Sequence, residues 1–316
     1  MDVFFSTIKV VMEEDIMKKY LGIDIGGTFI KYALMSEDGD ILEKGDTPTP
    51  KDTLDHMLES LDSFISKYKD EVSGIAISAP GRIDTHNGYM HTAGAINHYL
   101  GKTPLGDILT EKYGLPVAID NDAKCAANAE LWQGSLKDVS SGVVVIIGTG
   151  LGGGVVLENK VWRGIHGAAG EISNLPYDYT RLHEGAFWAG INGVYGLIKP
   201  YAVKKELPVE EVNGKVFFEA LHNHDVIAKE VFDEYVASMV SGIVSMQALL
   251  DVEKFCIGGG ISAQDVLINA IREGVDEFFT NNPWFPSIKP VIDRCAFKND
   301  ANLIGALNNF YEVHGR

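Results

Sequence analysis

One glycine-rich segment, Gly148–Gly154, limits the folds open to this chain more than any other part of it. Five of its seven residues are glycine, and it joins two apolar runs, Gly142–Ile147 and Gly153–Leu157, that predict buried strands. Glycine costs conformational entropy, and a hairpin turn needs fewer than five. Glycines let backbone N–H groups converge on an anion, so the segment predicts a phosphate-binding turn. It matches neither a Walker loop, because no Gly-Lys-Ser/Thr follows, nor a Rossmann fingerprint, because a strand follows rather than a helix.

The same strand–glycine–strand pattern occurs earlier in the chain. Asp24 lies at the end of the apolar run Tyr20–Ile25, the residues Gly26-Gly27-Thr28 follow, and Ile30–Ser36 is the next apolar run. We expect this turn to bind phosphate and Asp24 to hold water bound to Mg²⁺, a cation that prefers oxygen ligands and retains several waters. A tight hairpin that merely requires glycine is the alternative. Strands alternating with helices elsewhere predict a mixed α/β fold with two related lobes.

Two further segments have both a chemical and a purely structural interpretation. Asp122 lies between the glycine turns, where a strand leads into a helix, and is either the helix N-cap or a carboxylate aimed at an incoming hydroxyl. Gly258-Gly259-Gly260 suits the base and ribose of a nucleotide, or the start of a helix. Phosphoryl transfer needs a base near the nucleophile and amides and a metal around the phosphates, and these segments together supply them.

Composition excludes several classes of partner. The chain has 316 residues, 46% of them apolar, and a formal net charge of −17, which disfavours nucleic acid and anionic membranes. No apolar run is long enough to span a bilayer, and Met1–Lys19 lacks the basic start and cleavage site of a signal peptide. Cys125, Cys256 and Cys295 are widely separated, so we expect buried thiols in a reducing compartment. These observations predict a cytoplasmic protein.

Six ordered pieces of the sequence resemble the ROK family of sugar kinases, within the actin-like and hexokinase-like superfamily. They are LGIDIGGTFIKYAL, ISAPGRID, IDNDAKCAANAELWQG, IIGTGLGGGVV, GIHGAAGEISN and CIGGGIS. The resemblance implies an α/β fold of two ribonuclease H-like lobes that flank a cleft for sugar, ATP and Mg²⁺. It places the first lobe at 19–137, completed by a helix at 301–316, and the second at 138–300, and residues 1–18 are then an extension. By analogy with the family, we expect a homodimer.

The resemblance also implies a role for each matching residue. Asp122 falls on the catalytic base that contacts the sugar and takes the proton from its C6 hydroxyl. The other residues that fall on sugar-binding positions are Ala79, Pro80, Gly81, Asn97, Asn121, Glu171 and, in a less certain register, Glu184. The residues that fall on phosphate- and adenosine-binding positions are Asp24, Gly26, Gly27, Thr28, Gly148, Thr149, Gly150, Gly152, Gly258 and Gly259.

One departure from the family concerns zinc. Many members read Gly-Glu-Ile-Gly-His followed by a cysteine-rich zinc loop. Here Gly170–Asn174 lacks that histidine and Leu175–Gly190 contains no cysteine, which leaves only His166 and His183 nearby. Two histidines without further ligands are a poor zinc site, so we expect no zinc. The departure leaves the sugar open among glucose, a β-glucoside, N-acetylmannosamine and fructose.

Two other functions compete with a sugar kinase. Sugar-responsive transcriptional regulators of the same family carry an N-terminal winged helix, which needs roughly 60 residues before the first phosphate motif. Only 23 residues precede Asp24 in this sequence. A sugar-binding protein without activity is the second alternative, and the intact Asp24, Asp122 and glycine turns argue against it.

Overall fold

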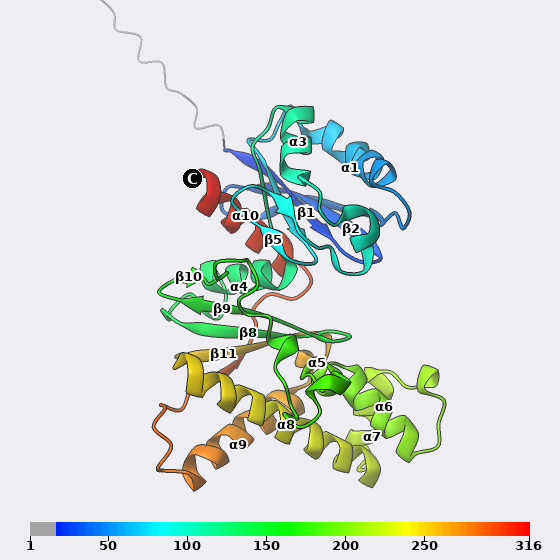
Figure 1. Cartoon of the computed structure of the whole chain (residues 1–316), viewed down its shortest axis with the longest axis vertical. Helices are drawn as coiled ribbons and strands as arrows, with labels where there is room; N and C mark the ends of the chain where they lie inside the picture. The colour runs from blue at the N-terminus through cyan, green and yellow to red at the C-terminus, as the bar shows by residue number, and fades with distance from the viewer. Residues whose placement is uncertain (1–16) are drawn as a thin grey trace, which may run out of the picture.

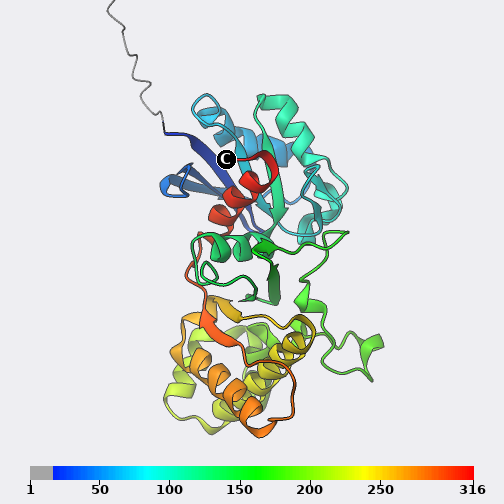
Figure 2. The ribbon, with the colours of Figure 1, turned by 90° about the vertical axis from the view of Figure 1, so that its left-hand side faces the viewer.

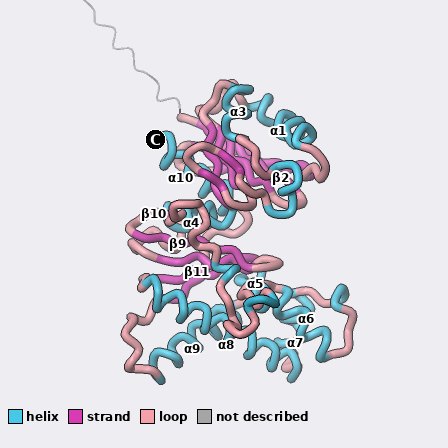
Figure 3. The backbone as a smooth tube through the Cα atoms, in the orientation of Figure 1, coloured by secondary structure: helices cyan, strands magenta, loops and turns pink. Residues whose placement is uncertain are grey.

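The computed structural model describes residues 17–316, so only Met17 and Lys18 of the predicted extension are described. This part of the chain forms two five-stranded sheets and one small hairpin. The sheets are stacked, with two helices between them and the other long helices on their outer faces (Figure 1). Figure 3 shows the two groups of strands separated by the helices labelled α4 and α10.

The first sheet has the strand order β3-β2-β1-β4-β7. Its first three strands are antiparallel, whereas β1, β4 and β7 are parallel. Apolar residues on one face pack against α1, which begins after the N-cap Thr53, and against α3. The elements of this half are β1 Lys19–Ile25, β2 Phe29–Ser36, β3 Ile41–Pro48, α1 Leu54–Tyr68, β4 Ile75–Ala79, β5 Ile83–Asp84, β6 Tyr89–Met90, α2 Asn97–Leu100, α3 Leu105–Tyr113 and β7 Val117–Asn121.

The second sheet repeats this plan in the order β10-β9-β8-β11-β12. Again three antiparallel strands are followed by two parallel ones. The longest helix, α8, and its neighbours cover the outer face with a large apolar core. The elements are β8 Gly142–Ile147, β9 Leu151–Leu157, β10 Lys160–Val161, α5 Ala189–Asn192, α6 Tyr195–Lys204, α7 Gly214–His222, α8 Val226–Leu250, β11 Lys254–Gly259, α9 Asp265–Asn281 and β12 Val291–Arg294.

Two helices cross between the sheets. Helix α4, Asp122–Trp132, follows the first sheet in sequence but packs on β8 and β9 of the second. Helix α10, Ala301–His314, follows the second sheet and packs on the first, as Figure 2 shows from the side. A Cβ on Gly305 would lie 1.7 Å from the carbonyl oxygen of Cys125, so only glycine permits so close a crossing.

The sequence prediction placed α4 with the first lobe, whereas its packing joins it to the second sheet. We therefore define the first lobe as the first sheet with α1–α3 and α10, and the second lobe as the second sheet with α4–α9. The prediction that Cys125, Cys256 and Cys295 are free and buried is confirmed. No helix among residues 17–316 has the length and apolar character needed to cross a membrane.

Candidate active site

A cleft of about 640 Å³ opens between the two lobes. Its walls come from strand ends of both sheets, from one face of α4 and from the connection between β12 and α10. Although the whole chain carries a net charge of −17, the cations Lys31, Arg82 and Lys298 line this cleft. The predicted site residues that line it are Gly81, Asn121, Asp122, Gly148, Gly150, Gly152, Glu171 and Gly259.

The second glycine turn is shorter than predicted. Strand β9 begins at Leu151, so the turn is limited to Gly148–Gly150 and the later glycines lie in a strand. These strand glycines allow α4 to pack closely on the sheet. A Cβ on Gly154 would lie 2.4 Å from the Cβ of Ala127, much closer than ordinary contact. Packing of α4 therefore accounts for part of the glycine excess that we had assigned to phosphate.

The remaining turn glycines have no such structural reason. A Cβ on Gly148 or on Gly150 would meet no heavy atom closer than 3.9 Å, so the fold itself tolerates larger residues there. The N–H groups of Thr149 and Gly150 donate to no acceptor in the described part of the chain. Open space beside free, exposed N–H groups is the arrangement that an anionic oxygen requires.

The first glycine turn has the same properties. The N–H of Gly26 closes the turn on the carbonyl oxygen of Phe29 at 3.0 Å. A Cβ on Gly27 would meet nothing within 4 Å, and within residues 17–316 the N–H groups of Gly27 and Thr28 have no acceptor. Both turns thus present free N–H groups and space that side chains could otherwise fill.

Asp24 lies beside the first turn with one carboxylate oxygen held and the other less engaged. Its Oδ1 accepts hydrogen bonds from Ser78 Oγ and from Asn302 Nδ2, each at 3.0 Å. Its Oδ2 has Lys31 Nζ at 3.8 Å. The three partners escaped sequence reasoning, although Lys31 faces Asp24 across the hairpin and the register of β1 and β2 could have identified it. A largely buried carboxylate with an oxygen turned to phosphate-binding turns fits water-mediated Mg²⁺.

Asp122 is the first residue of α4, and its neighbour caps the helix. The side chain of Asn121 accepts the N–H groups of Ala123 and Lys124, so the interpretation of Asp122 as N-cap is wrong. Asp122 Oδ1 accepts from Asn121 Nδ2 at 2.9 Å and from the Ala123 N–H at 2.8 Å. Its Oδ2 accepts no hydrogen bond from the described residues. The carboxylate is therefore fixed by one oxygen and free at the other.

The surroundings of Asp122 favour its protonated form. Burial is the main factor that raises the pKa of this carboxyl, and the negative charges of Asp24 and Glu171 raise it further. The Ala123 N–H and the Lys124 ammonium oppose the shift. A raised pKa makes the ionised carboxylate a better acceptor for a hydroxyl proton than an ordinary aspartate.

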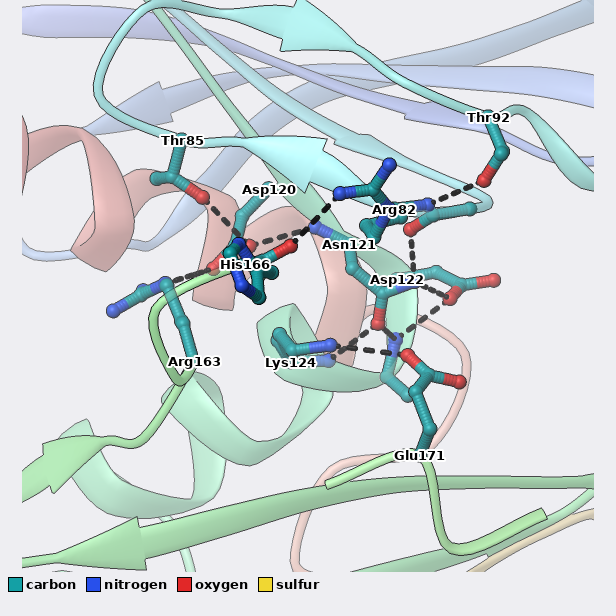
Figure 4. A network of polar contacts seen from close by, with 12 residues as sticks. Arg82, Thr85, Thr92, Asp120, Asn121, Asp122, Lys124, Arg163, His166 and Glu171 are labelled. Atoms are coloured by element: carbon teal, nitrogen blue, oxygen red, sulfur yellow. Dashed lines mark hydrogen bonds and ion pairs between the residues drawn. The ribbon is translucent and has the colours of Figure 1, made fainter. Parts of the chain in front are cut away.

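Glu171 faces α4 from the loop after β10 (Figure 4). Its Oε1 lies 3.1 Å from the ammonium of Lys124, which is only 1% exposed, whereas Glu171 is 42% exposed. A buried lysine needs such a partner because an unpaired ammonium is costly to bury. Lys124 therefore orients Glu171 at the cleft wall. Sequence reasoning missed Lys124, although it lies two residues after the predicted base in the same motif.

The other predicted sugar residues differ in position. Asn121 also donates to the carbonyl oxygen of Gly81 at 3.0 Å, so its amide is fully occupied and joins the cap to the loop after β4. Ala79 ends β4 in the core, and Pro80 follows it. The amide oxygen of Asn97 accepts the Ala93 N–H at 3.0 Å, and this residue does not line the cleft.

Glu184 is not brought to the cleft. It lies on an exposed loop and pairs with Arg181, with an N–O distance of 2.7 Å. The long zinc-loop counterpart, 175–190, contains too few buried residues to hold this carboxylate inward. Among residues 17–316, no three histidine, cysteine or acidic side chains gather as a metal site would require.

The strand end that precedes Asn121 is held by a buried ion pair, shown at the left of Figure 4. Asp120 is 1% exposed and accepts from Arg163 Nε at 2.9 Å and from Thr85 Oγ1 at 3.1 Å. The guanidinium also donates to Asn309 and Glu312 of α10. This network ties the base-bearing strand end to both lobes, and no sequence motif indicated it.

Gly258 and Gly259 end β11 with a packing role of their own. Gly259 has a φ of +92°, and a Cβ there would lie 2.1 Å from the carbonyl oxygen of Ile147. A second cavity of about 670 Å³ lies directly beyond, between α7 and the turn that starts at Gly260. The glycines therefore let the chain turn at the edge of this groove.

Comparisons with known proteins agree with this geometry. The sequence matches the ROK family over residues 20–312. It is 30% identical over 304 residues to the β-glucoside kinase of Listeria monocytogenes, covering 94% of this chain and 99% of that one. The fold matches a ROK family protein from Streptococcus pneumoniae TIGR4, solved in complex with sucrose, with a TM-score of 0.85, 28% identity and coverage of 93% and 98%.

A second solved structure extends the comparison to the nucleotide. It is a ROK family glucokinase from Streptomyces griseus in complex with glucose and AMPPNP, with a TM-score of 0.77, 25% identity and coverage of 92% and 98%. The predicted resemblance and the predicted two-lobed α/β fold are thereby confirmed. The chain belongs to the ROK family and, within it, to the ATP-dependent sugar kinases.

Proposed function

We propose that the protein transfers the γ-phosphoryl group of ATP to the primary hydroxyl, O6, of a hexose or hexoside. The observation that carries this proposal is the free Oδ2 of Asp122, at the N-terminus of α4 in the cleft lined by the second glycine turn. Asp122 Oδ2 accepts the hydroxyl proton as the sugar oxygen attacks the γ-phosphorus. The bond between that phosphorus and the bridging oxygen breaks, and ADP leaves.

The two glycine turns hold the phosphates in this proposal. The free N–H groups of Gly27, Thr28, Thr149 and Gly150 donate to phosphate oxygens. Adenosine lies beyond Gly259, in the groove beside α7. Asp24 holds Mg²⁺ through water, and when bound this cation neutralises charge on the β- and γ-phosphates.

The sugar occupies the part of the cleft nearest Glu171 and the loop that follows β4. Glu171 accepts sugar hydroxyls while Lys124 keeps it in place, and Asn121 holds Asp122 and Gly81 in register. Support for a hexoside comes from the similarity to a β-glucoside kinase and to a protein that binds sucrose. Assembly as a homodimer and a cytoplasmic location remain predictions.

A coupled assay of ADP release over a panel of sugars tests the proposal. The panel contains glucose, fructose, N-acetylmannosamine and β-linked glucose disaccharides. We expect one class of sugar to give a clearly higher kcat/KM. Absence of turnover with every sugar would contradict the assignment of the acceptor.

Asp122→Asn tests the base, because it replaces the free oxygen and can keep Oδ1 and its hydrogen bonds. We expect kcat to fall by about 10²–10⁴-fold while sugar binding stays measurable. Asp107→Asn is the matched control, since Asp107 also lies in the first turn of a helix but on α3, away from the cleft. Equal kcat in the two variants would refute the role of Asp122.

A further inference from the structure

Glu130 is a buried carboxylate that takes no part in the steps above. It is 1% exposed, and within residues 17–316 it forms no ion pair. It lies near the end of α4, on the face that lines the cleft. A buried charge of this kind persists only when hydrogen bonds replace its hydration.

Three backbone N–H groups supply those hydrogen bonds. Glu130 Oε2 accepts from Ser135 at 2.7 Å and from Ala296 at 3.0 Å, and Oε1 accepts from Phe297 at 2.9 Å. Charge-assisted bonds of this kind are about twice as strong as neutral ones. Glu130 thus fixes the start of residues 295–300, which link β12 to α10 and which we call the return connection.

The far end of the return connection is fixed to the first lobe. Lys44 of β3 holds the carboxylate of Asp300 at 3.2 Å. Two residues further on, Asn302 donates to Asp24 at 3.0 Å. Between the two fixed ends lie Lys298 and Asn299, which are exposed and whose N–H groups donate to no acceptor among the described residues.

We propose that Glu130 is a positioning residue that holds the second-lobe end of the return connection and confines lobe closure to Lys298 and Asn299. Sugar kinases close their lobes on their substrates, and a hinge is a short stretch that absorbs the change in backbone angles. Because Glu130 fixes where that stretch begins, it also determines how Asn302 meets Asp24. The inference rests on the proposed function in so far as Asp24 serves the nucleotide.

Glu130→Gln tests this inference, because it keeps the shape of the side chain but removes its charge and turns one acceptor into a donor. We expect ADP affinity, measured by calorimetry, to fall about tenfold while sugar affinity is unchanged. Glu253→Gln is the matched control, since Glu253 accepts the N–H groups of Ser140 and Ser141 but does not contact the return connection. Equal ADP affinity of Glu130→Gln and the wild type would overturn the inference.

A double-mutant cycle separates positioning from general support of the fold. If Glu130 acts through Asn302, Glu130→Gln changes ADP affinity less in an Asn302→Ala background than in the wild type. Full additivity of the two changes would overturn this route. Loss of both ADP and sugar affinity together would also overturn it, because a structural defect affects both sites.

Asn299→Pro tests the hinge without touching Glu130. Proline fixes φ, and the N–H that it removes has no acceptor in the described chain. We expect kcat to fall several-fold with an unchanged Tm, and an unchanged kcat would refute this placement of the hinge. Absence of wild-type turnover would sink the proposed function alone, whereas ADP affinity tests Glu130 independently of turnover.

Discussion

The strongest prediction separates glycines that serve phosphate from glycines that serve packing. In Gly150→Ala the nearest atom to the new Cβ is the Cβ of Ala189, at 3.9 Å, and Gly150 has no positive φ. The substitution should leave the free energy of unfolding unchanged or raise it by about 0.4–1 kcal/mol, since alanine restricts the unfolded chain. In Gly154→Ala the new Cβ would lie 2.4 Å from Ala127, and overpacking of this kind costs about 1–3 kcal/mol.

The effect on catalysis should be reversed. A methyl group on Gly150 occupies the space of a phosphate oxygen and weakens a charge-assisted hydrogen bond of about 1.5–3 kcal/mol. The KM for ATP should therefore rise by roughly 10- to 100-fold in Gly150→Ala. Gly154→Ala should lower Tm by about 2–4 °C per kcal/mol lost, with a smaller change in KM.

Urea unfolding and initial rates at varied ATP decide between these outcomes. The reasoning is refuted if Gly150→Ala binds ATP normally, because the open space beside Gly150 would then have no ligand. It is equally refuted if Gly150→Ala is destabilised as much as Gly154→Ala, since the fold would then require both glycines.

Three further predictions follow from the charges of the site. Because burial raises the pKa of Asp122, kcat/KM should rise with pH along an acid limb above the ordinary aspartate value of about 3.9, and a limb at that value would contradict the shift. The same shift means that ionised Asp122 destabilises the fold, so Asp122→Asn should have the higher Tm at neutral pH, an advantage that disappears below the ordinary aspartate pKa. Lys124→Met should raise the sugar KM several-fold at little cost in stability, because Glu171 loses its partner while a buried ammonium is removed, and an unchanged KM would contradict this role. Arg163→Met should lower the free energy of unfolding by about 3–5 kcal/mol in urea, because Asp120 is left buried without its counter-ion, and a change below about 1 kcal/mol would contradict it.

Local sequence signals predicted most of the elements. Helices at Leu105–Tyr113 and Val226–Leu250 and the strand Gly142–Ile147 match the prediction at both ends, because each combines a clear apolar pattern with glycine or polar residues at its ends. Boundaries moved where neighbouring strands decided them. Strand β9 starts at Leu151 because its residues pair with β8 from that point, which the local glycine content conceals.

The site was predictable only where its residues lie in short motifs. Asp24, Asp122 and the glycine turns are read from contiguous letters, so their chemistry follows from residue type and order. Asn302 and Glu130 carry no local signal, since their partners Asp24 and Phe297 lie 278 and 167 positions away in the chain. Such contacts form only when β12 returns the chain to the first lobe.

The sequence by itself therefore determined the family, the two-lobed plan and which residues bear the chemistry. Only the tertiary structure decided how they are held. It gave the cap to Asn121 and left Asp122 with a free oxygen, and it divided the glycines between packing and open space. The physical reason is that hydrogen-bond saturation and close packing depend on atoms from distant segments, whereas backbone pattern and residue type are local.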